Sequence, residues 1–348
     1  MKAYALYEIN DLRYEETPIP QIGEDEVLLR VEAAGICGSD IPRIFYNGTY
    51  HFPTIPGHEF AGFVEKIGKN VDESLLGARC GAFPLIPCME CDCCKSKKYE
   101  MCKNYNYLGS RTDGGFAEYV KMPSWNLIRL PDQISYEEAA MLEPMAVAVH
   151  AMRSIAPKAD ETVVVCGLGT IGLFLTMFLK KEGIKNLYVI GNKEIQKNTA
   201  LQLGISDENY IDCTKTDVDA WIMNATNGKG VDVFFECVGK NETMCQALNL
   251  TAPGGRIQMV GNPASNITFD QKTYWKLLRS QLTMKGSWNS SFTKEKTDDW
   301  HYVLDCIVEG KVHPKECISH SFDFTDLEKG LQIMKEKSEE YIKVMITK

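Results

Sequence analysis

The sequence lacks the features that mark membrane, secreted and nucleic-acid-binding proteins. It has no apolar run of the roughly 18 residues that a membrane span needs, and the first stretch, MKAYALYEIN, lacks the apolar core of a secretory signal peptide. Positive charge is scarce, since 38 lysines and arginines face 47 acidic residues and leave a net charge of −9. Nucleic-acid binders normally carry a basic face. We therefore expect a cytoplasmic protein with no nucleic-acid partner and no membrane partner.

A disulfide framework is also not expected. The thirteen cysteines are an odd number and no secretion signal accompanies them, and in a reducing compartment clustered cysteines more often bind metal. With 348 residues, 44% of them hydrophobic, the chain is long enough for two domains, each with its own core.

One stretch, residues 34–59, gathers groups that can hold a metal. It contains a thiol at Cys37, an imidazole at His58 and carboxylates at Asp40 and Glu59. A thiolate, an imidazole and a carboxylate suit zinc and leave a fourth position open for a substrate. Either Cys37 or His58 alone would more often be a buried structural residue, so the prediction depends on further motifs.

Four cysteines within one short segment predict a second metal site. The spacing C-x2-C-x2-C-x7-C is formed by Cys88, Cys91, Cys94 and Cys102. Four thiolates can close a tetrahedral zinc shell with no open position, which is a structural arrangement. An iron–sulfur cluster is the alternative, because it too is held by four thiolates. We interpret Cys93 as a bystander.

The pattern of the chain changes near residue 135. Residues 1–130 are rich in glycine and proline and predict mostly β-structure, whereas a helix capped by Ser135 is expected to kink at Pro144. Glu143 stands at that kink, where it can reach a metal or simply be a solvated helix charge. Beyond it, β-like runs alternate with helical stretches, which predicts a parallel sheet. The final strand, YIKVMIT, is expected to rejoin the N-terminal β-domain.

A dinucleotide fingerprint opens this second region. The run ETVVVC leads directly into G-x-G-x-x-G and an apolar helix, the strand–turn–helix context that the fingerprint requires. The expected cofactor-binding residues in this turn are Gly167, Gly169, Thr170, Ile171 and Gly172.

The end of the next strand bears on the choice of cofactor. NAD-binding folds usually place an acid there for the ribose 2′-hydroxyl, but here Gly191, Asn192 and Lys193 follow the strand. A small residue, an amide and a cation leave room for a 2′-phosphate. We therefore favour NADP(H), with NAD(H) as the alternative if Lys193 is only a solvated helix residue.

Together these motifs resemble the zinc-dependent medium-chain dehydrogenase/reductase family, over essentially the whole chain. The resemblance is carried by GHEFAGFVEKIG, the four-cysteine segment, Glu143-Pro144 and GLGTIG. CGSDIPRIFYNGTYHFP, YLGSRTDGGFAEYV and LLRSQLTMKGSW most resemble the family's polyol-phosphate and sorbitol-type polyol dehydrogenases.

The resemblance implies an α/β fold with a GroES-like β-rich catalytic domain and a doubly wound Rossmann domain with a parallel sheet. The expected bounds are 1–142 and 288–348 for the catalytic domain, about 85–105 for its structural zinc lobe, and 143–287 for the Rossmann domain. The resemblance also implies a homo-oligomer, either a homodimer or a homotetramer.

Two zinc ions per chain are implied, one catalytic and one structural. Cys37, His58 and Glu143 are the implied catalytic ligands, and Glu59 is adjacent and can ligate or exchange. Asp40 is expected to orient His58, and Ser39 to relay the substrate's proton.

The implied reaction is hydride transfer between NAD(P) and a secondary alcohol of a polyol or polyol phosphate. Arg43 and Arg111 are the candidates for binding a phosphate. The alternatives are a dehydrogenase of a free polyol such as sorbitol, xylitol or a vicinal diol, or a reductase of simple ketones. A zinc-binding, NADPH-binding protein without turnover, or a zinc-ribbon interaction module, is the alternative outside enzymes.

Overall fold

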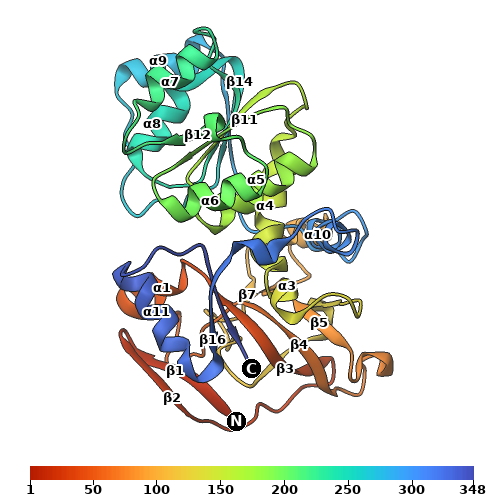
Figure 1. Ribbon diagram of the computed structural model, residues 1–348. Coiled ribbons are helices and arrows are strands. Elements are labelled where there is room, and N and C mark those ends of the chain that lie inside the picture. Colours follow the sequence, from red (N-terminus) through yellow and green to blue (C-terminus); the bar gives the residue numbers. More distant parts are fainter. The chain divides into compact units, whose positions relative to one another are not determined.

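The computed structural model describes residues 1–348 and divides them into two compact units. The first comprises Met1–Glu143 and Ser291–Lys348, and the second comprises Pro144–Ser290. These boundaries fall one residue and three residues after those expected from the sequence. Figure 1 shows the elements of each unit.

The first unit is built around a seven-stranded sheet. The order is β16-β17-β3-β4-β5-β9, and β8 also pairs with β3. Two small two-stranded sheets, β1-β2 and β6-β7, accompany it. The strands are β1 (Lys2–Glu8), β2 (Asp11–Glu16), β3 (Glu26–Ile36), β4 (Glu59–Ile67), β5 (Arg79–Ala82), β6 (Leu85–Ile86), β7 (Asn106–Tyr107), β8 (Tyr119–Pro123), β9 (Leu127–Arg129), β16 (Ile318–Asp323) and β17 (Lys343–Thr347).

The long strand β3 organises this sheet. One of its edges pairs along its length with β4, and the other is shared, with residues 26–30 paired to β8 and residues 33–36 paired to β17. The expectation that the last strand rejoins the N-terminal β-domain is therefore confirmed. The helices of this unit are α1 (Asp40–Pro42), α2 (Asp92–Lys95), α3 (Tyr136–Ala140), α10 (Asp299–Val308) and α11 (Leu327–Glu336).

The helical stretch after residue 135 is interrupted, as expected. Ser135 caps α3 in a capping box with Glu138, and α4 (Leu142–Ile155) starts after a one-residue break. Pro144 lies in the first turn of α4, where its missing N–H removes no helical hydrogen bond. Glu143 is thereby fixed at the start of α4.

The second unit is a doubly wound parallel sheet in the order β12-β11-β10-β13-β14-β15. Helices α5 and α6 lie together on one side of it, and α7, α8 and α9 group on the other (Figure 1). Its strands are β10 (Thr162–Cys166), β11 (Asn186–Gly191), β12 (Tyr210–Asp212), β13 (Val231–Glu236), β14 (Thr251–Met259) and β15 (Thr283–Gly286). Its helices are α5 (Thr170–Lys181), α6 (Glu194–Gln202), α7 (Val218–Ala225), α8 (Asn241–Leu250) and α9 (Gln271–Arg279).

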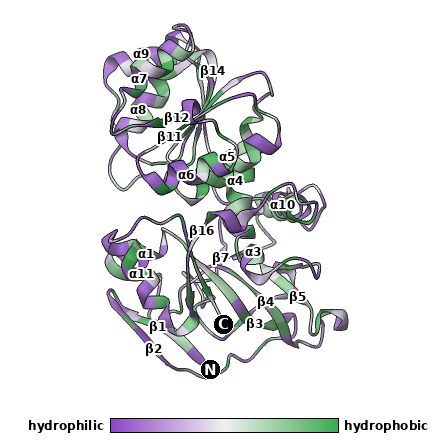
Figure 2. Cartoon of the chain, in the orientation of Figure 1, coloured by the Kyte–Doolittle hydropathy of each residue, from purple (hydrophilic) through white to green (hydrophobic).

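The central strands of this sheet are apolar because both faces are covered. Val163, Val164 and Val165 of β10 are fully buried, as expected of a parallel sheet between helical layers. Helix α5 is buried from Gly172 to Leu179, and Figure 2 shows it as largely hydrophobic. No helix of the molecule has the length and apolar character needed to cross a membrane.

Candidate functional site

Strand pairing in the first unit brings three potential metal ligands together. Cys37 directly follows β3, while His58 and Glu59 stand at the start of β4, and Gly35 pairs with Glu59 across the two strands. One ligand atom from each of Cys37, His58 and Glu59 lies within 4.8 Å of the others. His58 and Glu59 are almost fully buried, so these groups are held by the packing of the sheet.

Asp40 fixes the orientation of this set. It is fully buried and accepts a 3.0 Å hydrogen bond from the N–H of Cys37. Its Oδ1 lies 3.4 Å from Nδ1 of His58, which leaves Nε2 of the imidazole for a metal. Burial alone would raise the pKa of Asp40, but His58, Arg43 and the Cys37 N–H outweigh it and hold that pKa below its usual range.

The surroundings of His58 favour positive charge at the centre of the set. Burial alone would lower the pKa of His58, but Asp40 and Cys37 raise it well above the usual value. A thiol, an imidazole and a carboxylate in a buried, negatively charged environment suit a zinc ion. The residues present therefore fit a catalytic zinc with an open position.

Ser39 lies at the exposed side of this set. Its Oγ donates a 3.3 Å hydrogen bond to Sγ of Cys37, and the residue is exposed to solvent. The hydroxyl is thus within reach of both the metal ligands and bulk water.

Glu143 is close to these groups but is not part of the compact set. It is buried and accepts a 3.3 Å hydrogen bond from the hydroxyl of Tyr107. Burial raises the pKa of Glu143 to about 7, Glu59 also raises it, and His58 and Lys343 oppose this effect. The sequence suggested Glu143 as the third ligand, whereas here Glu59 occupies that place in the set.

One residue of the site was missed in the sequence. Lys343, the first residue of β17, is buried and forms an ion pair with Glu59. Breaking a buried ion pair by removing one partner typically costs about 3–5 kcal/mol, so Lys343 is part of what keeps Glu59 in place. The only sequence signal was a single cation within an apolar strand, and nothing in it identified the partner.

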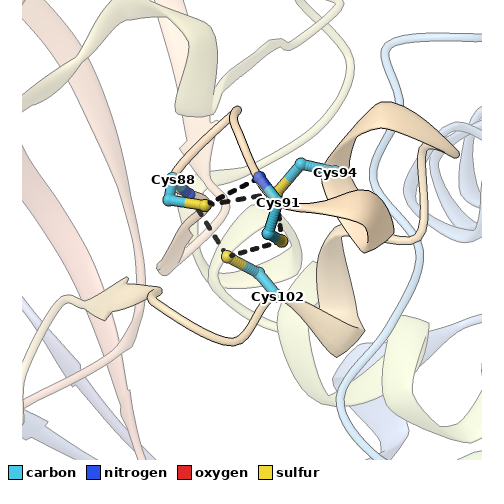
Figure 3. Close-up of side chains that lie close together, drawn as sticks. All are labelled: Cys88, Cys91, Cys94 and Cys102. Atoms are coloured by element: carbon cyan, nitrogen blue, oxygen red, sulfur yellow. Dashed lines mark hydrogen bonds between the residues drawn. The ribbon is translucent and has the colours of Figure 1, made fainter.

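The four cysteines of the second set converge on one point. The Sγ–Sγ distances are 3.5 Å for Cys91–Cys94 and 3.9 Å for Cys88–Cys94 and Cys91–Cys102 (Figure 3). Thiolates about 2.3 Å from one zinc ion lie about 3.8 Å apart in a tetrahedron. The set therefore fits a single tetrahedral ion, whereas an iron–sulfur cluster attaches its thiolates to different iron atoms and spreads them further. Cys93 lies outside the set.

Backbone N–H groups prepare part of this set for metal binding. N–H groups of Cys94 and Lys103 lower the pKa of Cys91 to about 6, and those of Glu90 and Cys91 lower the pKa of Cys88. Burial instead raises the pKa of Cys94 to about 12. A cation is therefore needed to keep all four sulfurs as thiolates at neutral pH.

The glycine-rich turn of the second unit borders a cavity of about 300 Å³. Gly167 has a φ of +96°, and a Cβ there would lie 2.5 Å from Val238. A Cβ on Gly172 would lie 1.9 Å from the carbonyl oxygen of Gly167, whereas Gly169 faces open space. These glycines shape the turn and let a pyrophosphate approach the start of α5, where Thr170 and Ile171 are the first helical residues.

The end of β11 forms another wall of the cavity. Gly191 and Asn192 line it, and the N–H of Asn192 donates a 3.0 Å hydrogen bond to the side chain of Gln196. The residues that line the cavity include no aspartate or glutamate. Lys193 stands at the N-cap position of α6, and Lys197 within that helix forms a 2.6 Å ion pair with Asp207. The acid typical of NAD-binding folds is thus absent from this wall.

The two arginines suggested as phosphate ligands differ in their surroundings. Nη1 of Arg43 donates a 2.7 Å hydrogen bond to the buried Asp40, so this guanidinium already neutralises a carboxylate. Arg111 instead lies between two rings, 4.2 Å from the centre of Tyr50 and 4.3 Å from that of Tyr105.

The polar contacts of Arg111 are all to uncharged groups. Its Nη atoms make long hydrogen bonds of 3.3 Å to the hydroxyl of Tyr50 and 3.4 Å to the carbonyl of Tyr105, and its buried Nε has no hydrogen-bond partner. From Tyr105 a series of rings leads through Tyr107, at 6.3 Å, to His58 at a further 5.8 Å. Arg111 is therefore a cation without a carboxylate partner. These ring contacts connect it to His58 of the metal-ligand set.

Comparison with known families identifies both units. Residues 23–132 match the family model described as the alcohol dehydrogenase GroES-like domain, and residues 170–309 match the one described as zinc-binding dehydrogenase. The chain is 30% identical over 315 residues to galactitol 1-phosphate 5-dehydrogenase of Escherichia coli strain K12, a match that covers 90% of each chain.

Solved structures give the same result. A zinc-binding dehydrogenase from Sinorhizobium meliloti 1021, bound to NADP, is 26% identical with a TM-score of 0.91 and covers 100% of this chain and 99% of its own. A protein described as a short chain alcohol dehydrogenase from Escherichia coli CFT073, in complex with NADH, is 27% identical with a TM-score of 0.90 at the same coverage.

Proposed function

Since this chain belongs to the zinc-binding dehydrogenases with an alcohol dehydrogenase GroES-like domain, and is an NAD(P)-dependent alcohol or polyol dehydrogenase, we propose that it oxidises a secondary hydroxyl of a polyol phosphate. The observation that carries the proposal is the arrangement of Cys37, His58 and Glu59 in one unit, together with the guanidinium of Arg111, which has no carboxylate partner. Oxidation of galactitol 1-phosphate compared with free galactitol is the experiment that tests it.

In this proposal each residue has a defined task. Zinc supplies Lewis acidity and the nicotinamide cofactor supplies the hydride chemistry. Cys37, His58 and Glu59 would hold the metal, and Asp40, whose Oδ1 lies 3.4 Å from Nδ1 of His58, would orient the imidazole. Oγ of Ser39 accepts the substrate's hydroxyl proton and passes it to water, a role that its exposure supports. Glu143, the ligand that the family resemblance implies, would exchange with Glu59 at the metal.

Arg111 is the proposed phosphate ligand. A phosphate would give its guanidinium the anionic partner that it lacks in the protein, and planar guanidinium groups suit phosphate recognition. Stacking between Tyr50 and Tyr105 holds the group in place before the substrate arrives. Arg43 is unsuited to this task because it already pairs with Asp40.

We expect Arg111→Met to raise KM for galactitol 1-phosphate by about 10- to 100-fold, since a hydrogen bond to a charged group contributes about 1.5–3 kcal/mol. KM for free galactitol should stay unchanged. Steady-state kinetics with both substrates measure this, and Arg129→Met is the matched control because the side chain of Arg129 hydrogen-bonds to Ser74, outside the proposed site. Equal changes for the two substrates would contradict the assignment and favour a free polyol or simple secondary alcohol as substrate.

NADP(H) is the proposed cofactor, because no carboxylate lines the cavity where a ribose 2′-phosphate would lie. We expect fluorescence titration to give tighter binding of NADPH than of NADH. Lys193→Met should weaken the binding of NADPH by about tenfold, the scale of one charge-assisted hydrogen bond, and leave the affinity for NADH unchanged. Lys197→Met, which removes a neighbouring positive charge of α6, is the control. Tighter NADH binding by the unmodified protein would reverse the cofactor assignment.

A homodimer or homotetramer remains the expected assembly. It is supported by β15, an edge strand of the second unit whose residues are all exposed, and by exposed apolar side chains nearby. These are Tyr274, Trp275, Leu278, Met284 and Trp288. Such edges are usually covered or paired, and the mass in solution, measured by light scattering, decides the state.

A further inference from the structure

Lys343 is exceptional among the cations of this chain. Of the 38 lysines and arginines, it is the only one that is buried, with 1% of its surface exposed. Lysine is almost never fully buried unless it is paired, because removing its charge from water is strongly unfavourable. A lysine in this position therefore requires a specific partner.

The contacts of Lys343 reach both strands that carry the catalytic ligands. Its Nζ donates to the carbonyl oxygen of Ile36, at 3.1 Å, and to Oε2 of Glu59. Ile36 directly precedes Cys37, and Glu59 directly follows His58. One ammonium group thus connects the backbone beside the thiol ligand to the carboxylate ligand.

The neighbouring strand leaves space for this pair. Gly35 lies on β3 opposite Glu59, and a Cβ at that position would lie 2.3 Å from Oε2 of Glu59 and 2.7 Å from Cε of Lys343. Any larger residue would occupy the space where the ion pair forms. The absence of a side chain at Gly35 of β3 therefore makes room for the ion pair between Lys343 and Glu59.

We propose that Lys343 is a positioning residue that retains one carboxylate oxygen of Glu59 and so leaves only the other oxygen for the catalytic metal. A carboxylate that gives one oxygen occupies one coordination position, whereas a released carboxylate can give both. The position kept free in this way is the one that a substrate hydroxyl needs. This inference rests on the proposed zinc-dependent function.

The proposal predicts that removing the charge of Lys343 changes the affinities for zinc and for substrate in opposite directions. Without Lys343, the metal-free protein contains a buried carboxylate with no cation beside it, which is unfavourable. A divalent ion relieves this charge, so the variant should bind zinc more tightly than the unmodified protein does. Glu59 then also competes for the open position, so substrate binding should weaken. Simple loss of structure would weaken both.

The test compares Lys343→Met, which removes the charge at similar size, with Lys343→Arg, which keeps it. For Lys343→Met we expect zinc affinity, measured by chelator competition, to rise about tenfold, the scale on which residues behind metal ligands act. KM for the alcohol should rise by a similar factor, and the visible spectrum of the cobalt(II)-substituted protein should change. Lys343→Arg should restore all three properties. Unchanged or weaker zinc binding by Lys343→Met, or an unchanged KM, would overturn the proposal.

Two further variants separate this role from general destabilisation. Arg256→Met removes an ion pair with Glu161 in the second unit and should lower the melting temperature without altering zinc affinity. In a Glu59→Gln background, Lys343→Met should no longer raise zinc affinity, because the charge that needs compensation is gone. A persistent rise there would contradict the proposal, even if Lys343→Met folds poorly on its own.

These measurements are independent of the substrate assignment. If the unmodified protein oxidises no polyol or polyol phosphate, the proposed function fails. The zinc affinities and cobalt spectra would still show whether Lys343 controls Glu59.

Discussion

Replacing Cys37 by serine should lower kcat/KM by about a thousandfold or more and leave the fold intact. The Lewis acid contributes several kcal/mol of transition-state stabilisation, and each 1.4 kcal/mol corresponds to about tenfold in rate. A serine hydroxyl is a poor substitute for a thiolate as a zinc ligand. The zinc content should fall from about two ions per chain to about one, measured by elemental analysis beside the kinetics.

Cys245→Ser is the matched control for this variant. Cys245 is half-buried on α8 and belongs to neither metal set, so its replacement should keep both zinc ions and full activity. Turnover by Cys37→Ser at the unmodified rate would refute the catalytic role of the Cys37 set. Loss of activity with both zinc ions retained would instead mean that Cys37 acts without binding metal.

Cys102→Ser should cost the protein its other zinc ion and much of its stability. The three remaining thiols cannot close the tetrahedron, and Cys94, the buried one among them, then reverts to a neutral thiol. We expect a melting temperature lower by about 10 °C, since about 1 kcal/mol shifts the melting temperature of a domain of this size by about 2–4 °C. Thermal unfolding followed by circular dichroism, with zinc analysis, measures both effects.

The control for this variant lies in the same segment. Cys93 is adjacent to Cys94 but is not one of the four cysteines whose sulfurs lie together, so Cys93→Ser should melt as the unmodified protein does. If Cys102→Ser retained two zinc ions and a normal melting temperature, the four-cysteine site would have to be assigned differently.

The four-cysteine set was predictable because its ligands are local. All four lie between residues 88 and 102, so chain geometry alone brings them together once the segment folds. The glycine-rich turn was predictable for the same reason, since strand, turn and helix follow one another directly. In both cases the spacing of residues encodes the structure.

Contacts between distant segments could not be predicted in this way. Lys343 and Glu59 are separated by 284 positions, and only the pairing of β17 and β4 with β3 makes them neighbours. The choice between Glu59 and Glu143 likewise depends on where α4 starts relative to β4. Both acids belong to sequence motifs of the family, so only their positions in the folded protein show which one lies with Cys37 and His58.

The outermost strands of the second sheet were also missed. β12 has three residues and β15 four, and β15 is exposed throughout. Neither shows an apolar run like the one that predicted β10, because edge strands are not covered on all sides. Short, exposed strands carry too little hydrophobic pattern to be recognised in a sequence.

The position of β17 at the end of the chain has a consequence for folding during synthesis. The carbonyl of Ile36 and its partner Lys343 are 307 positions apart, so at about 5–20 residues per second a ribosome needs roughly 15 to 60 seconds to make the stretch between them. During this time the whole second unit is synthesised. Residues 33–36 of β3 meanwhile lack the strand, β17, with which they pair in the folded protein. The contact between Lys343 and Glu59 at the metal-binding centre is therefore among the last to form in a nascent chain.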